Sequence, residues 1–188
     1  YSQKWAEATF LYLTLQKTLP EALKELYLKQ QKLTDNTFEE WLQNYFGGLY
    51  NLPPTPPVMV HHVPFHIRRF LEKAPKNKAA LILVDGLSKV QATLLEAELK
   101  EGFTNSSYIT QNLFAWLPTL TGISRKTIFS GKIPYFFKKE LLETDSEAAS
   151  WNLYWKNQGY SEKQIHYEKL SKEEDLQNFL ASCNFQQV

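Results

Sequence analysis

The sequence predicts an α/β protein in which an N-terminal helical region, residues 1–52, is followed by the first part of a sheet domain, residues 78–188. Two observations predict this class. Apolar residues recur at helical spacing throughout the first region. From Lys78 onwards, continuous apolar runs of strand length alternate with helical patterns, which is typical of a parallel sheet covered by helices. Residues 53–77 are expected to connect the two parts.

The N-terminal region contains three amphipathic patterns. The first spans residues 10–15 and the second spans residues 23–33. The third opens at Thr37, which is followed three residues later by Glu40, the spacing of a capping box. Three successive helices are therefore expected before the connector.

The connector opens with Pro53-Pro54-Thr55-Pro56-Pro57, which cannot be helical and favours a stiff, extended conformation. Such a run is found both in proline-rich recognition ligands and in rigid spacers between structural elements. The spacer is favoured here, because the run separates a helical region from a region of different pattern. A short helix is expected to begin near Pro64.

Three histidines, His61, His62 and His66, surround the start of that helix. Imidazole is a common zinc ligand. However, these histidines lack the helical two-histidine spacing with an added carboxylate that metal sites use. Local packing and capping are therefore favoured over a metal role.

The region from residue 78 onwards alternates strand and helix patterns. Its first apolar run, residues 79–84, is apolar on both faces, as in a buried parallel strand. Near the end, Ser171 and Glu174 have the spacing of a second capping box, which opens a final helix. Strands are expected at 79–84, 108–110 with 113–117, and 164–169, and helices at 90–99, 124–129, 147–156 and after 171.

Composition excludes several classes of protein. No apolar run approaches the roughly 20 residues that a membrane-spanning helix needs. The net charge is +1, far from the strongly basic balance of a dedicated nucleic-acid binder. A local patch such as Arg68-Arg69 can contact phosphate, but ordinary solvated surface is favoured for it. The single cysteine, Cys183, excludes an internal disulfide and favours a reducing, cytoplasmic setting.

The last residues, 184–188, resemble the lead-in to another strand, so the fold is expected to continue past Val188.

Asp85 is the first residue with a chemical role to consider. It follows the predicted strand 79–84 directly and precedes Gly86. Ligands in open α/β sheets bind at the carboxyl ends of strands, so a role in a site is one interpretation of Asp85. Taken alone, Asp85 is favoured as a cap for the next helix, because capping is the commoner use of that position. The sequence contains neither a GxGxxG motif after this strand nor a GxxxxGK[ST] motif, so a dinucleotide site and a P-loop are unsupported.

A second candidate is the hydroxyl-rich segment 117–131, in which Thr121 stands at the expected start of a helix. The free amides and the dipole of a helix N-terminus favour a phosphate. A hydroxyl there can become a nucleophile when a metal lowers its pKa. Arg125, about one turn later, has the reach to hold phosphate oxygens. The alternatives are a capping threonine and a surface arginine.

These residues together resemble the alkaline phosphatase superfamily, and within it the PglZ proteins of BREX-type phage-defence systems. The similarity rests on Asp85-Gly86 after an apolar strand, then on Leu117-Pro118-Thr119-Leu120-Thr121, Arg125 and Phe129-Ser130-Gly131. Upstream, 38–42, Tyr45 and 57–61 are also similar to the region that precedes the catalytic domain of these proteins. The resemblance implies that residues 78–188 are the first part of an alkaline-phosphatase-like α/β domain.

The resemblance also implies roles for individual residues. Asp85 would be a metal ligand, and Thr121 would be the nucleophile that also contacts metal. Thr119, Ser124 and Arg125 would support the substrate phosphate. Two divalent ions, Zn²⁺ or Mn²⁺, complete such a site in the family, held by a later cluster of acids and histidines.

This later cluster is missing from the sequence. After Thr121, His166 stands alone within a predicted strand. Two residues cannot hold two metal ions, which need several carboxylate or imidazole ligands. We therefore expect the remaining ligands to lie beyond Val188, and the present chain by itself to bind metal poorly and to turn over little or no substrate.

The function implied by the resemblance is metal-dependent hydrolysis of a phosphodiester or phosphomonoester, with a nucleic acid or nucleotide as substrate and other defence-system proteins as partners. A transferase or mutase that uses the same chemistry is a weaker alternative. The alternative from another class is a non-catalytic phosphatase-fold scaffold in a multi-protein defence complex, because a fold does not determine a function. The acid and histidine cluster distinguishes the two, since only the enzyme needs it.

Overall fold

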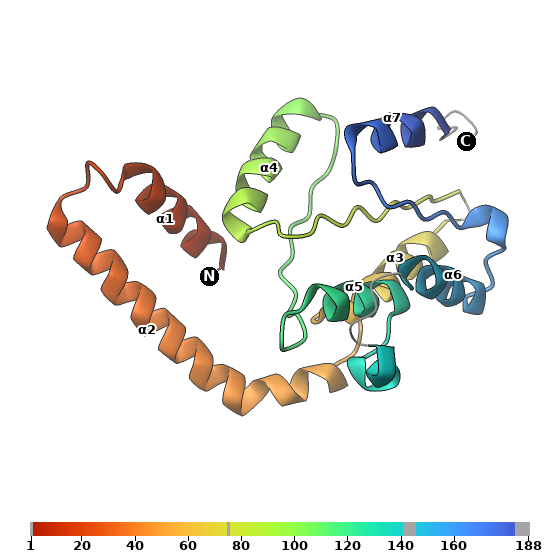
Figure 1. Ribbon diagram of the computed structural model, residues 1–188, viewed down its shortest axis with the longest axis horizontal. Coiled ribbons are helices and arrows are strands. Elements are labelled where there is room, and N and C mark those ends of the chain that lie inside the picture. Colours follow the sequence, from red (N-terminus) through yellow and green to blue (C-terminus); the bar gives the residue numbers. More distant parts are fainter. Residues whose placement is uncertain (1, 75, 141–145, 183–188) are drawn as a thin grey trace. The chain divides into compact units, whose positions relative to one another are not determined.

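The computed structural model describes residues 2–74, 76–140 and 146–182 (Figure 1). The described residues are mainly helical and include no strand, so the predicted α/β sheet is wrong. The elements are α1 (Ser2–Leu15), α2 (Glu21–Tyr45), η1 (Phe46–Asn51), η2 (Val60–His62), α3 (Val63–Glu72), α4 (Lys89–Gly102), α5 (Thr121–Ser130), η3 (Pro134–Glu140), α6 (Glu147–Asn157), η4 (Glu162–Gln164) and α7 (Glu173–Ser182), where η denotes a 3₁₀ helix. None of the described helices is long and apolar enough to cross a membrane.

The predicted strands fail because a strand needs a second backbone to pair with. The apolar run 79–84 has no ladder partner among the described residues, and Ile82 within it is 84% exposed. The sheet-like pairing that the described residues do contain is a single parallel bridge between Met59 and Phe114. In this bridge the amide of Val60 donates to the carbonyl of Phe114 at 3.0 Å. An apolar run of strand length therefore did not suffice to predict a sheet.

The chain divides into two compact units, each described here by itself. The first comprises Tyr1–Asn51 and Ile82–Asn112, and the second comprises Leu52–Leu81 and Leu113–Val188. The first unit therefore combines the N-terminal helices with α4, which the sequence assigned to the sheet domain. The second unit combines the proline connector and α3 with α5 and α6.

An aromatic stack joins α1 to α2 in the first unit. The ring of Tyr27 stacks on Tyr12, with centroids 4.0 Å apart, and on Trp5, with centroids 5.5 Å apart. The Tyr27 hydroxyl donates to Oγ1 of Thr9 at 3.1 Å. These contacts place Tyr27 of α2 against α1.

The second and third predicted helices are one continuous helix, α2, of 25 residues. Thr37, expected to cap a new helix, instead donates its hydroxyl to the carbonyl of Leu33 at 2.8 Å. This back-bonding to the preceding turn is a normal use of threonine inside a helix. The capping-box spacing at Thr37 and Glu40 was therefore misleading.

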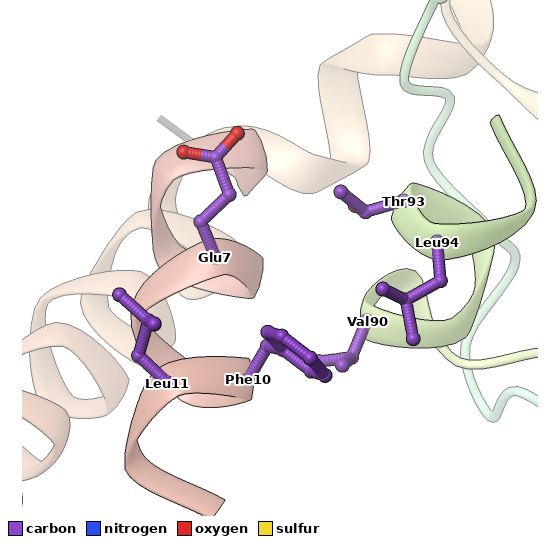
Figure 2. A pocket seen from close by; sticks show the side chains of 6 residues that line it. All are labelled: Glu7, Phe10, Leu11, Val90, Thr93 and Leu94. Atoms are coloured by element: carbon purple, nitrogen blue, oxygen red, sulfur yellow. The ribbon is translucent and has the colours of Figure 1, made fainter. Parts of the chain in front are cut away.

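Helix α4 also packs on α1, and the two leave an apolar groove of about 300 Å³ between them (Figure 2). The helix begins at Ser88, whose Oγ accepts from the amide of Gln91 at 3.2 Å. The Gln91 side chain in turn accepts from the amide of Ser88 at 2.9 Å, which completes a capping box. Ser88, and not Asp85, is therefore the N-cap of this helix.

Helix α5 lies at the centre of the second unit and packs against α6, η2 and α3. Thr127 of α5 is fully buried, and so is Met59 just before η2. The helix ends at Gly131, which adopts a left-handed conformation with φ of 64°. A Cβ at this position would lie 2.9 Å from Cε2 of Tyr154, so α6 packs against bare backbone here.

The C-terminal capping prediction names the wrong acid. The carboxylate of Asp175 accepts from the amides of Ser171 and Lys172, each at 2.9 Å, before α7 begins. Glu174, the predicted partner, is not the acid in these bonds. The predicted lead-in strand 184–188 and Cys183 lie outside the described residues.

Candidate functional site

Thr121 is the first residue of α5, and its side chain is exposed to solvent. The N-cap is Leu120, which is extended and makes no side-chain capping bond. The amide of Ser124 donates to the carbonyl of Leu120 at 2.9 Å and so begins the helical ladder. The amides of residues 121–123 therefore precede that ladder and point out of the helix N-terminus. The hydroxyl of Thr121 lies beside these donors and at the positive end of the helix dipole.

A tight turn leads the chain into this helix. The Leu117–Pro118 peptide bond is cis, and the amide of Leu120 donates back to the carbonyl of Pro118 at 2.8 Å. Thr119 lies within this turn and is exposed. The turn therefore presents Thr119 and Thr121 to solvent two residues apart at the start of α5.

Arg125 lies one turn after Thr121, and its charge is used inside the unit. Its Nη2 donates to Oε2 of Glu147 at 2.6 Å. The hydroxyl of Tyr167 donates to the same oxygen at 2.6 Å. Glu147 is only 3% exposed, so this cluster joins α5, α6 and the segment after η4 from within. That Arg125 contacts the substrate phosphate stays a prediction. The structure shows that Arg125 also anchors α5 to Glu147 of α6.

The same cluster perturbs Tyr167. Burial raises the pKa of its phenol to about 12, and the hydrogen bond to Glu147 and the negative charge of Glu147 act in the same direction. The phenol therefore stays protonated and remains a donor to Glu147 at physiological pH. Sequence reasoning identified neither Glu147 nor Tyr167, because nothing in their local patterns indicates that they contact Arg125.

Ser124 is half-buried on the first turn of α5. Its carbonyl accepts from the hydroxyl of the buried Thr127 at 2.8 Å. Because Ser124 is three residues after Thr121, the two side chains share one side of the helix. A supporting role for Ser124 near Thr121 stays a prediction.

Asp85 lies in an exposed turn before α4, and Gly86 after it has a positive φ of 69°. It belongs to the first unit, whereas Thr119, Thr121, Ser124 and Arg125 belong to the second. The structure thus gathers four of the five predicted site residues around α5. The pairing of Asp85 with Thr121 stays a prediction.

Two of the three connector histidines, His61 and His62, serve packing, whereas His66 is exposed. Nδ1 of His62 accepts from the amides of Val58 and Met59 at 3.1 and 3.4 Å. Nδ1 of His61 accepts from Nε1 of Trp116 at 3.3 Å. Burial, together with the neighbouring His62, lowers the pKa of His61 to about 4. Both rings are therefore neutral and buried, in agreement with a packing role.

A two-metal site needs several acidic or imidazole ligands in one place. Within the described parts of the chain, no group of three or more His, Cys, Asp or Glu side chains is positioned to hold an ion. The described residues by themselves therefore do not supply enough ligands for the two metal ions that the resemblance implies.

Comparison with known proteins bears on this arrangement. The family model of the BREX system PglZ alkaline phosphatase-like domain matches residues 64–185, which is more than half of the chain. The match includes Asp85, all of α5, and α3 except its first residue. No curated protein and no solved structure matches the chain significantly. The chain belongs to the BREX PglZ alkaline phosphatase-like family.

Proposed function

We propose that this chain carries the nucleophile of a phosphoesterase that hydrolyses phosphodiester or phosphomonoester bonds. The observation that carries the proposal is the exposed Thr121 at the first position of α5, beside amides that precede the helical ladder. Membership of an alkaline phosphatase-like family supports the same class of reaction.

The chemistry proceeds in two displacements. The Thr121 oxygen attacks phosphorus, the bond from phosphorus to the leaving oxygen breaks, and the hydroxyl proton passes to solvent while the leaving oxygen takes one up. Water then attacks the phosphothreonine and releases phosphate or a phosphomonoester, which regenerates the hydroxyl. The amides of residues 121–123 are the donors available to the phosphoryl oxygens during both steps.

Divalent Zn²⁺ or Mn²⁺ remains the proposed activator, with Asp85 and Thr121 as ligands. Because the described residues supply no further cluster of ligands, no step above is derived through a metal. A nucleotide or nucleic acid remains the proposed substrate, and other proteins of the defence system remain the proposed partners.

The test compares Thr121→Val with Thr119→Val, a matched change at the exposed threonine two residues earlier. Both changes are made in the full-length protein, which is assayed with Zn²⁺ or Mn²⁺ on a chromogenic phosphodiester and a phosphomonoester, and quenched samples are searched by mass spectrometry for phosphothreonine. We expect turnover and the phosphorylated peptide to disappear in Thr121→Val only. Metal-dependent turnover that survives Thr121→Val would exclude Thr121 as the nucleophile.

A second candidate function is a non-catalytic scaffold. One observation favours it: Arg125, the predicted phosphate contact, is engaged with Glu147 inside the unit. A folded protein that shows no turnover with either metal, yet binds its defence partners equally well with and without Thr121→Val, would support the scaffold.

A further inference from the structure

One short segment of the second unit is rich in cationic residues. Residues 68–78 carry five lysines or arginines and one glutamate. The whole chain has 21 Lys and Arg and 20 Asp and Glu, so the rest of the chain has 16 and 19. The near-neutral total therefore conceals a strongly basic segment on an otherwise acidic chain.

Helix α3 presents part of this charge on one exposed side. Phe65, Arg69 and Lys73 follow one another at intervals of four residues, so they align along the helix. Phe70, next to Arg69, is 46% exposed. Pro64 faces the interior and is fully buried. The exposed side of α3 thus carries Arg69, Phe70 and Lys73, whereas Phe65 is half-buried against Tyr154.

The turn after α3 holds another lysine next to this side. The Asn77 side chain donates to the carbonyl of Phe70 at 2.7 Å, and the Asn77 amide donates to Ala74 at 3.0 Å. These bonds fold the chain back onto the end of α3, and the exposed Lys76 lies within the turn. Arg69, Phe70, Lys73 and Lys76 are hereafter called the α3 basic face.

The cations of this face are not neutralised by neighbouring acids. Arg68 pairs with Glu72 at 3.0 Å and also donates to Gln158, so its charge is satisfied. By contrast, among the described residues no carboxylate lies within ion-pair distance of Arg69, Lys73 or Lys76. Three exposed cations on α3 and the turn after it therefore have no acid against them.

A cleft of about 210 Å³ borders the basic face. One wall is the proline connector, and the other is the start of α3, including Arg69. Proline backbone is stiff, so this wall is preformed rather than folded around a ligand. The lining residues are Pro53, Pro54, Thr55, Phe65, Arg68 and Arg69.

We propose that the α3 basic face binds the phosphate backbone of a nucleic acid. Unpaired lysines and arginines release counterions when they contact successive phosphates, which provides affinity without sequence preference. An exposed aromatic ring between the cations offers a surface for stacking an unpaired base, so single strands are favoured over duplex. The proposal requires binding alone, so it is independent of whether Thr121 is a nucleophile.

The test measures binding without turnover. Fluorescence anisotropy of a labelled mixed-sequence single strand and of the matching duplex is followed with the 188-residue chain in EDTA, over a range of salt concentrations. The test variant is Arg69→Gln/Lys73→Gln/Lys76→Gln. Its matched control is Lys17→Gln/Lys29→Gln/Lys32→Gln, which removes three exposed lysines from the first unit. Circular dichroism checks that all three proteins keep the same helix content.

We expect the test variant to lose about tenfold or more in affinity at low salt, and the control to lose little. The slope of log affinity against log salt should fall by about 0.7 for each phosphate contact removed from a single strand. Phe70→Ala should weaken single-strand binding and leave duplex binding unchanged, because only an unpaired base can stack on the ring. Because the assay in EDTA records binding in the absence of turnover, its outcome is separate from that of the proposed hydrolysis.

Three results would overturn the proposal. The first is that the wild-type chain fails to bind either nucleic acid at low salt. The second is that the test and control variants lose affinity equally, which would indicate non-specific charge attraction. The third is tighter binding to vesicles of anionic phospholipid than to nucleic acid, with the same dependence on the three residues, which would indicate a membrane surface instead.

Discussion

Arg125 and Glu147 form an ion pair inside the second unit, with Nη2 of the arginine 2.6 Å from Oε2 of the glutamate. The pair fastens α5 to α6, and Tyr167 completes it with a hydrogen bond to the same carboxylate oxygen. Because Arg125 is one turn after Thr121, the pair fixes the helix that presents the proposed nucleophile. The exposed start of α5 is therefore held in place by an ion pair in the interior of the unit.

Glu147→Gln should lower the free energy of unfolding by about 3 kcal/mol, because it removes one charge from a buried pair and leaves the other without its counterion. The matched control is Glu162→Gln, which removes a carboxylate paired with Lys156 on the surface and should change stability little. Urea unfolding followed by circular dichroism measures both. Equal midpoints for the two variants would show that the buried pair does not stabilise the unit.

Gly131→Ala should destabilise the protein by about 2 kcal/mol. The left-handed backbone at φ 64° disfavours a side chain, and the added methyl would meet Cε2 of Tyr154 at 2.9 Å. Gly102→Ala at the end of α4 is the control, since a Cβ there meets nothing and alanine favours helix. Thermal melting should show a lower Tm for Gly131→Ala alone, and an unchanged Tm would mean that α6 can move away.

Stability should fall on acidification because of His61. Its pKa is about 4 when folded, against 6.5 ordinarily, so between these values the unfolded chain binds a proton that the folded chain does not. The free energy of unfolding should therefore be highest above pH 6.5 and decrease towards pH 4.

His61→Gln should flatten this decrease, since the amide oxygen can still accept from Trp116 but does not titrate. His166→Gln, at an exposed histidine, should leave the decrease as it is in the wild type. Urea midpoints at several pH values provide the comparison. A pH dependence that is identical in His61→Gln and the wild type would contradict the assignment to His61.

Tyr27 should contribute to the first unit through both its ring and its hydroxyl. Tyr27→Phe keeps the stacks on Tyr12 and Trp5 and loses the bond to Thr9, so it should lower the free energy of unfolding by about 1 kcal/mol. Tyr27→Leu also loses the ring contacts and should lower it by about 1 kcal/mol more. A double-mutant cycle with Thr9→Val checks the hydrogen bond, and full additivity of the two changes would exclude it.

Several local features could be predicted from the sequence. Periodicity located α4, α5 and α6 closely, because helix hydrogen bonds join residues four apart and depend mainly on nearby side chains. The proline-led start of α3 followed from the same local reasoning. The capping-box signals succeeded less well, since Thr37 lies inside α2 and Asp175 replaces Glu174 before α7.

The strands could not be predicted in this way. The runs at 79–84 and 164–169 have the composition of strands, but a strand forms only when a distant segment supplies matching backbone groups. No ladder joins either run to another segment in the described parts of the chain. Apolar composition indicates that a segment can form a strand, but not whether the fold supplies a second segment to pair with it.

The candidate site shows the same division. Thr121 at a helix start and Arg125 one turn later follow from spacing, and the motif that contains them indicated the family that the comparison shows. The burial of Arg125 against Glu147 and Tyr167 could not be predicted, since these partners are 22 and 42 positions away along the chain.

The sequence by itself therefore determined the family, the main helices of the second unit and the place of Thr121 at the start of α5. Tertiary structure alone decided that the apolar runs do not form a sheet, that Arg125 is anchored by Glu147, and that the α3 cations remain exposed. The physical reason is the range of the interactions: helix formation is satisfied within a few residues, whereas strand pairing and charge pairing depend on which distant groups the fold brings together.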